Sequence, residues 1–233
     1  MRTVHFRSVA IAATALLTLV GSVAAQETST ALLTSVEVRQ LVARGEPSDH
    51  IRLRAHFLAL ADQYEAEANR HAAMSQGFGG NPSRNLGAGT SAHCKRLVDL
   101  NTQSATTVRE LATYSEKLGR GEAPTAPSGG AGFHAGAGAT RPSEAELVSL
   151  AAKASTPSDH RILSEYFTEL AKRYRTDAEE QAATAVFMRG PTRAPAAANV
   201  AAYYDRLSKQ SAAAAIEAAG AAAMHHEHAR AVR

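Results

Sequence analysis

The sequence predicts an all-α protein in which a long helical hairpin occurs twice and closes into an antiparallel four-helix bundle, each hairpin being preceded by a short helix. Two stretches begin alike, PSDHIRLRAHFLALADQYEAEA from Pro47 and PSDHRILSEYFTELAKRYRTDA from Pro157, which indicates an internal repeat. In both stretches, apolar residues recur at the spacing of an amphipathic helix. Abundant alanine, with no Trp and only six Phe and six Tyr, favours slender, closely packed helices.

The N-terminal segment, residues 1–25, is expected to be a signal peptide and not part of the fold. It has a basic start at Arg2 and Arg7, followed by an apolar stretch at 9–20 that is too short to span a bilayer. Small residues near its end predict cleavage after Ala25. The mature protein is therefore expected to be periplasmic or secreted, with no membrane span.

Charge and cysteine content exclude several classes of function. Removal of residues 1–25 takes away two arginines and no acid, so the formal charge falls from +3 to +1. A nearly balanced chain has no electrostatic case for binding nucleic acid or an anionic membrane. The only cysteine, Cys94, cannot form an internal disulfide, and the CxxCH motif of a c-type haem is absent. No catalytic motif is visible, so we expect no enzymatic activity and no catalytic residues.

Two short amphipathic helices are expected, one before each hairpin, near 35–43 and near 143–154. The second opens with SEAE, a capping-box pattern in which Ser143 caps the helix. A Gly-, Ala- and Pro-rich stretch without periodicity lies between the hairpins and is typical of a linker. The predicted organisation is therefore a first unit at 26–118, a linker at 119–142 and a second unit at 143–233.

The long helices have recognisable starts and breaks. In the second unit, Thr156 can cap the helix and Asp159 can bond back to that cap. The first unit has Glu46 in place of the threonine, so its helix start is expected to be weaker. The Gly- and Pro-containing stretches at 77–89 and 189–195 are expected to end these helices. The second helices of the two hairpins are then expected at about 91–118 and about 196–229.

Possible metal ligands gather at the loop end of the first hairpin. A count in steps of seven residues from His50 reaches His71, so His71 should point into the bundle. Met74 closes the same helix, while His93 and Cys94 open the next one. Imidazole nitrogens with soft sulfur atoms suit copper, Cu(I) in particular, and His with Cys also suits zinc. The sequence thus predicts a metal site of His71, Met74, His93 and Cys94, with ordinary packing as the alternative.

A second set of histidines occurs at helix ends. An up-down-up-down order of the four long helices would bring His50 and His160, at two helix starts, beside His225 and His228, at the end of the last helix. This predicts a second, weaker candidate metal site of His50, His160, His225 and His228. The alternative is that the first two cap neighbouring helices while MHHEH at 224–228 is a solvated tail.

Cys94 has a further expected role. Placed near a helix N-terminus, its thiolate would be favoured, and we expect the side chain to be partly accessible. An unpaired cysteine in a secreted protein could act as a reactive thiol or join two copies in a disulfide-linked homodimer.

The motifs PSDH, HAAM at 71–74 and AHCKRL at 92–97 carry a resemblance. The chain resembles an uncharacterised group of secreted bacterial helical-repeat proteins with the pattern PxDH, HxxM and HCxxL. The resemblance implies the helical-repeat fold and no particular activity, and the second hairpin lacks HxxM and HC. We therefore expect an exported helical-bundle protein that binds copper or zinc in the cell envelope. The alternative is a non-enzymatic structural, scaffold or chaperone-like protein that contacts an envelope partner.

Overall fold

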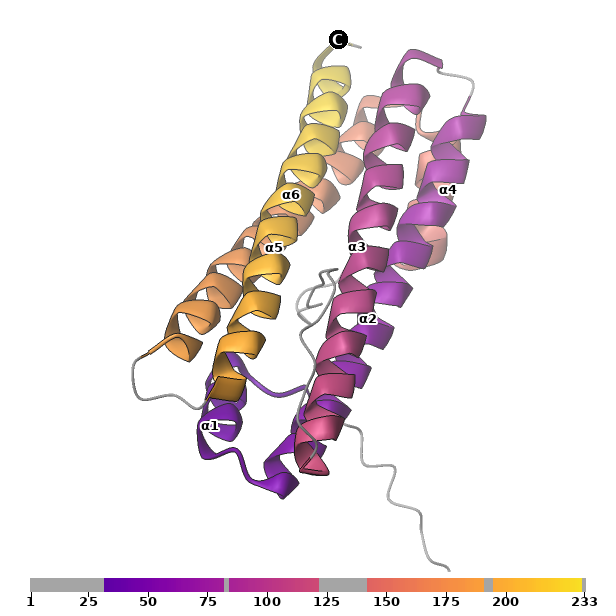
Figure 1. Cartoon of the computed structure of the whole chain (residues 1–233). Helices are drawn as coiled ribbons and strands as arrows, with labels where there is room; N and C mark the ends of the chain where they lie inside the picture. The colour runs from indigo at the N-terminus through magenta and orange to yellow at the C-terminus, as the bar shows by residue number, and fades with distance from the viewer. Residues whose placement is uncertain (1–31, 82–83, 122–141, 191–194, 232–233) are drawn as a thin grey trace, which may run out of the picture.

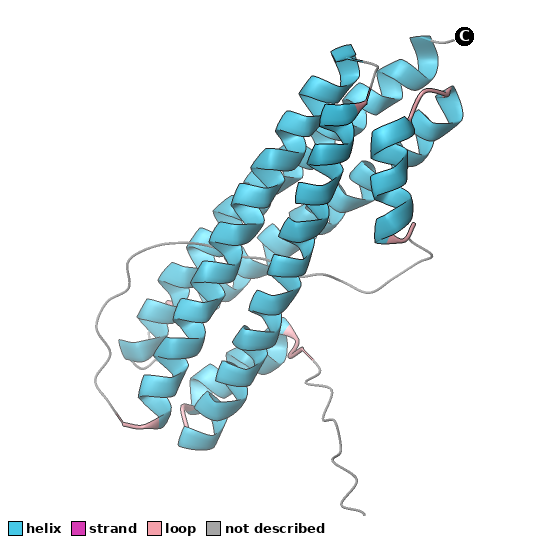
Figure 2. Ribbon diagram, turned by 90° about the vertical axis from the view of Figure 1, so that its right-hand side faces the viewer, coloured by secondary structure: helices cyan, strands magenta, loops and turns pink. Residues whose placement is uncertain are grey.

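The computed structural model describes residues 32–81, 84–121, 142–190 and 195–231, without the side chains of 84–87 and 195. Within these ranges all regular structure is helical and no strand occurs (Figures 1 and 2). The predicted signal peptide and nearly all of the predicted linker lie outside the described residues. No helix in the described part is long and apolar enough to cross a membrane.

In the described residues six helices follow one another, two short and four long, as the sequence predicts. Their bounds are α1 (Ser35–Arg44), α2 (Pro47–Gly80), α3 (Arg84–Gly119), α4 (Glu144–Lys153), α5 (Pro157–Met188) and α6 (Pro195–Ala231). Helices α2 and α3 lie side by side, as do α5 and α6, so both hairpins are confirmed (Figure 1). The two hairpins meet through α3 and α6.

The helix starts follow the predicted chemistry. The Thr156 side chain accepts a hydrogen bond from the backbone of Asp159, whose carboxylate accepts one from the backbone of Thr156. The equivalent start of α2 has no side-chain cap at Glu46. Asp49 instead accepts hydrogen bonds from Arg44 Nε at 3.0 Å and Nη2 at 2.5 Å. An ion pair to α1 therefore replaces the missing capping box of the first unit.

The break between α2 and α3 is much shorter than the predicted 77–89. Helix α2 continues through Gly77 because α4 packs directly against this glycine. A Cβ atom at Gly77 would lie 3.1 Å from the Ala151 Cβ and 3.2 Å from the Val148 carbonyl oxygen. Tertiary packing thus overrides the weak helix propensity of glycine. Helix α3 begins correspondingly early, at Arg84, which places Cys94 about three turns inside the helix.

The short helices cross over to the opposite hairpin. Helix α4 lies along the end of α2, where the Asn81 side-chain amide donates to the carbonyl oxygens of Ala151 and Ala154, both at 3.2 Å. Helix α1 contacts α5 in the same way, with the Arg39 guanidinium 5.6 Å from the ring centre of Phe187. Each short helix therefore contacts the hairpin of the other unit, and α1 also packs against α2 of its own unit.

The direction of the second hairpin differs from the expected up-down-up-down order. His225, near the end of α6, contacts the ring of Phe78, near the end of α2, at 5.4 Å between centroids. The same histidine contacts His160 in the first turn of α5. Helix α5 therefore starts where α2 ends, and the starts of α2 and α5 lie at opposite ends of the molecule (Figure 1).

The predicted apolar stripes form the core. Large side chains from equivalent positions of the two units are fully buried, among them Phe57 and Phe167, Tyr64 and Tyr174, and Leu53 and Leu163. The alanine-rich part of α6 packs closely, since Ala214, Ala218 and Ala221 have no exposed surface. The repeat offset therefore identifies the interior face of each long helix correctly.

Candidate metal site

The four residues of the first predicted metal site lie in two different environments. His71, Met74 and Cys94 are fully buried. His93 turns toward α6, where its Nδ1 lies 2.6 Å from Glu217 Oε2, and its ring lies against Gly220. In the described part of the chain, no group of three or more His, Cys, Asp and Glu side chains is arranged to hold a metal ion.

Cys94 is not the accessible thiol that the sequence predicted. Its exposed fraction is 0%, and burial raises the pKa of the thiol to about 12. The expectation was wrong because it assumed a helix start near residue 91, whereas α3 starts at Arg84. The N-terminal amide groups that would stabilise a thiolate lie about three turns away. At neutral pH Cys94 is a protonated, inert core residue.

His71 lies beside a buried cluster of charged groups. Its Nε2 lies 3.6 Å from Oε1 of Glu67, and the same oxygen accepts a hydrogen bond from Arg173 Nη2 at 2.9 Å. Arg70 also pairs with this carboxylate. Burial alone would raise the pKa of Glu67, but His71 and the two arginines outweigh it and hold the pKa well below its usual range. The sequence-based reasoning missed this cluster, although Glu67 and Asp177 are both acids at the 110-residue repeat offset.

Three of the four histidines in the second predicted set come together. Nδ1 of His160 lies 3.2 Å from Nδ1 of His225, and their rings stack with centroids 5.4 Å apart. The ring of His228 lies 5.8 Å from that of His160. Phe167 stacks on His225 at 5.9 Å, and Phe78 covers it from α2. The result is a histidine cluster, defined as His160, His225 and His228, with an apolar cover.

Local structure fixes the positions of these side chains. His160 follows directly after Asp159, so the capping box of α5 sets where its first turn begins. One turn later, Ser164 Oγ donates to the Ala222 carbonyl oxygen at 3.1 Å, which ties α5 to the last turns of α6. His225 and His228 are three residues apart on α6 and therefore share one helix face.

The buried histidines of the cluster are in their neutral form at pH 7. Burial, and then the nearby His160 and His228, lower the pKa of His225 to about 3. Burial and His228 also lower the pKa of His160, against the opposing effect of Asp159. Neutral imidazole is the form that binds metal ions. The hydrogen bond between the two Nδ1 atoms places a proton on one of them, so a metal ion bound there would require that ring to carry its proton on Nε2 instead.

The fourth histidine of the set lies elsewhere. His50 is near the opposite end, beside the end of α3 and the start of α6, where Ser115 and Val200 are neighbours. The separation follows from the reversed direction of the second hairpin. A site that contains all of His50, His160, His225 and His228 is therefore not formed.

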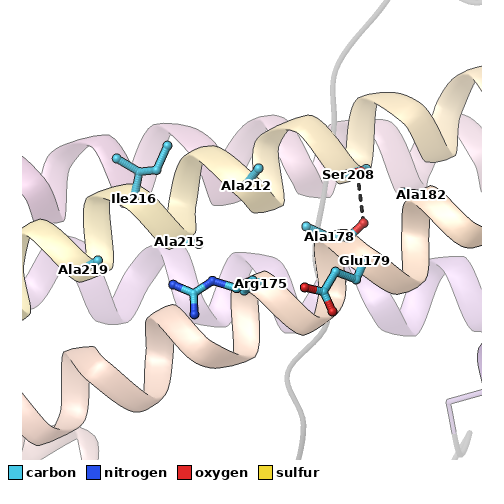
Figure 3. Close-up of a pocket in the computed structure, with 9 residues that line it drawn as sticks. All are labelled: Arg175, Ala178, Glu179, Ala182, Ser208, Ala212, Ala215, Ile216 and Ala219. Atoms are coloured by element: carbon cyan, nitrogen blue, oxygen red, sulfur yellow. Dashed lines mark hydrogen bonds between the residues drawn. The ribbon is translucent and has the colours of Figure 1, made fainter.

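A shallow groove between α5 and α6 is a further surface feature. It has a volume of about 460 Å³ and is lined mostly by alanines, with Arg175 and Glu179 at its edge (Figure 3). The Ser208 hydroxyl beside it donates to the Ala178 carbonyl oxygen at 2.9 Å. The groove has too few convergent polar groups for a catalytic site.

Comparison of the chain with protein families, curated proteins and solved structures finds no match in any of the three. The resemblance noted from the PSDH, HAAM and AHCKRL motifs therefore stays a prediction.

Proposed function

We propose that the chain is an exported four-helix-bundle protein of the cell envelope that binds a transition metal, zinc first, through the histidine cluster. The observation that carries the proposal is the 3.2 Å separation of the His160 and His225 Nδ1 atoms. Two Zn–N bonds of about 2.05 Å at the tetrahedral angle separate their nitrogens by about 3.3 Å. The observed separation is thus close to that of two nitrogen ligands on one zinc ion.

The third ligand in this proposal is His228. It lies on the same face of α6 as His225, with its ring centroid 5.8 Å from that of His160. The three imidazoles do not surround one point as they stand, so the proposal requires the His228 side chain to change its rotamer on binding. Three imidazoles leave the fourth position of a tetrahedral zinc ion for water or a small ligand. The absence of sulfur from this cluster removes the reason to prefer Cu(I), so zinc precedes copper.

The test is a thermal and calorimetric titration of untagged protein with Zn²⁺ and Cu²⁺. Binding should stabilise the fold by about 2.7 kcal/mol when free metal is a hundredfold above its dissociation constant. His160→Ala and His228→Ala should lose this stabilisation. His71→Ala and Cys94→Ser serve as matched controls, because both residues are buried outside the cluster, and they should keep it.

The alternative function is a non-enzymatic scaffold that contacts an envelope partner. The observation in its favour is Ile216, which is 70% exposed beside the groove between α5 and α6. A wild-type protein that binds neither metal would favour this alternative. If His71→Ala and Cys94→Ser abolished binding while His160→Ala kept it, the metal would sit at the first predicted set instead.

A further inference from the structure

The two units differ in one residue that faces the start of their first long helix. The repeat offset of 110 residues relates His50 to His160, Phe57 to Phe167 and Ser115 to His225. The histidine and phenylalanine of the first helix are the same in both units. The residue that faces them from the second helix is an imidazole in the second unit and a small hydroxyl side chain in the first.

In the second unit, the ring of His225 contacts both the His160 ring and the Phe167 ring. It stacks against Phe167 with an interplanar angle of 8° and against His160 with an angle of 22°. Its Nδ1 shares a hydrogen bond with Nδ1 of His160. A flat aromatic ring with one hydrogen-bonding atom is therefore the group that this arrangement accommodates.

In the first unit, the equivalent space is a cavity of about 210 Å³. Ser115 is too small to fill it, so Phe57 and His50 face open volume. The cavity walls come from the end of α1, from α2, α3 and α6, and apart from His50 and Ser115 they are mostly apolar, with Phe57 on one side and Val200 on the other. An apolar protein cavity of about 150 Å³ is sufficient to bind benzene. The volume therefore suits a single aromatic ring with a small substituent.

His50 supplies one unpartnered polar atom to this cavity. Its side chain is buried, with an exposed fraction of 8%, and its Nδ1 has no hydrogen-bond partner. Burial lowers the pKa of His50, and this effect outweighs the Gly45 carbonyl, which favours the charged ring. A neutral imidazole has one nitrogen with a free lone pair, and Nδ1, which has no partner, can serve as that acceptor. A bound molecule that donates a hydrogen bond to Nδ1 would satisfy this buried atom.

We propose that this cavity is a binding site for a small, uncharged, single-ring aromatic molecule that carries one hydroxyl or ring N–H donor. The ring would occupy the place that the His225 ring occupies in the second unit, against Phe57, with its donor on His50 Nδ1. Apolar walls disfavour charged molecules, since burial of an unpaired charge is costly. The site lies at the opposite end of the molecule from the histidine cluster, so a failure of the metal proposal would not affect this one.

The experiment compares phenol with toluene, which has the same shape and lacks the hydroxyl donor. Binding to the full chain is followed by melting temperature and by the imidazole ¹⁵N resonances of His50. Phenol should bind the wild-type protein at least tenfold more tightly than toluene and should shift the His50 Nδ1 resonance. Absence of phenol binding, or equal binding of phenol and toluene, overturns the proposal.

Three variants localise the site. Ser115→His rebuilds the arrangement of the second unit and should abolish phenol binding. If Ser115→His fails to fold, Val200→Phe fills the cavity from the opposite wall and should also abolish phenol binding. His50→Phe removes the acceptor and should abolish the preference for phenol over toluene. His226→Phe, an exposed histidine on α6, is the matched control and should bind phenol as the wild-type protein does. Retained phenol binding in a folded Ser115→His or Val200→Phe protein would place the ligand elsewhere and refute the proposal.

Discussion

Glu67 and Asp177 are equivalent buried acids of the two hairpins, but Arg173 donates its hydrogen bond to Glu67 alone, at 2.9 Å. The residue that corresponds to Arg173 in the first unit is Gln63, which carries no charge to offer Asp177. Burial therefore raises the pKa of Asp177 to about 7, although the charge of Arg173 opposes the rise. Each of the two repeat-like hairpins therefore buries an acid at this position, and only Glu67 accepts a hydrogen bond from Arg173.

The uncompensated acid predicts a stability cost at neutral and alkaline pH. The folded-state pKa of Asp177 is raised above the unfolded value of about 3.9, so its contribution is fully present below that value and is lost as the pH rises through 7. The loss amounts to about 4 kcal/mol by pH 8. Asp177→Asn should therefore flatten the stability profile between pH 4 and 8, measured by urea unfolding. An unchanged slope would show that Asp177 is ionised in the core.

His225 should make the fold sensitive to acid. Its folded-state pKa of about 3 lies below the unfolded value of about 6.5, so the unfolded chain gains a proton first as the pH falls. Stability is then fully present above pH 6.5 and decreases toward pH 3, by about 2 kcal/mol at pH 5. His225→Gln should remove this decrease. Because Asp177 acts with the opposite sign between pH 4 and 6.5, the two effects should be separated by comparing single variants.

The Glu67–Arg173 pair should show the asymmetry of buried charges. Arg173→Leu removes one of the two arginines that pair with the buried Glu67 carboxylate and should cost about 3 to 5 kcal/mol of unfolding free energy. The double variant Glu67→Leu/Arg173→Leu should recover much of that loss. Both partners of the exposed pair between Arg109 and Glu65 are almost half exposed, so Arg109→Leu is the control and should cost less than about 1 kcal/mol. A double variant as unstable as the single one would contradict this account.

Two neighbouring glycines of α2 should respond in opposite directions to alanine. Gly77→Ala forces a Cβ against the Ala151 Cβ and the Val148 carbonyl, so it should cost about 1 to 3 kcal/mol by pushing α4 away. No atom lies within 4 Å of a Cβ at Gly79, so Gly79→Ala should stabilise the helix by roughly 0.5 to 1 kcal/mol. Thermal unfolding of the two variants measures both effects, and equal shifts would mean that α4 does not pack on Gly77.

The sequence predicts the hairpins because each repeat carries its own information about which face is buried. Phe57 and Tyr64 lie seven residues apart on one face of α2, and both are buried. A repeat does not determine which ends of two hairpins meet. His50 and His160 have nearly identical local sequences, but only His160 lies beside the end of α6, because that proximity depends on the relative direction of the hairpins.

For the candidate metal ligands too, the sequence predicts what local spacing determines and misses what depends on contacts between distant helices. The spacing of His225 and His228 predicts that they share a face of α6, and both contact His160. His93 lies at the edge of its helix face, and such a residue can turn toward either neighbouring helix. The carboxylate of Glu217 decides the direction, at 2.6 Å from the imidazole. A cross-helix pair 124 residues apart leaves no local signal in the sequence.

The exchange of short helices has a consequence for the ancestry of this fold. Helix α4 covers α2 and helix α1 contacts α5, so each half of the chain completes the other. A single half could bury the same surfaces only by pairing with a second copy of itself, in a twofold-symmetric dimer that swaps its short helices. Gene duplication and fusion of such a dimer would yield the present chain, after which each half was free to diverge. The unequal pairs Ser115 and His225, and Glu67 and Asp177, are the kind of specialisation that a symmetric dimer could not have acquired.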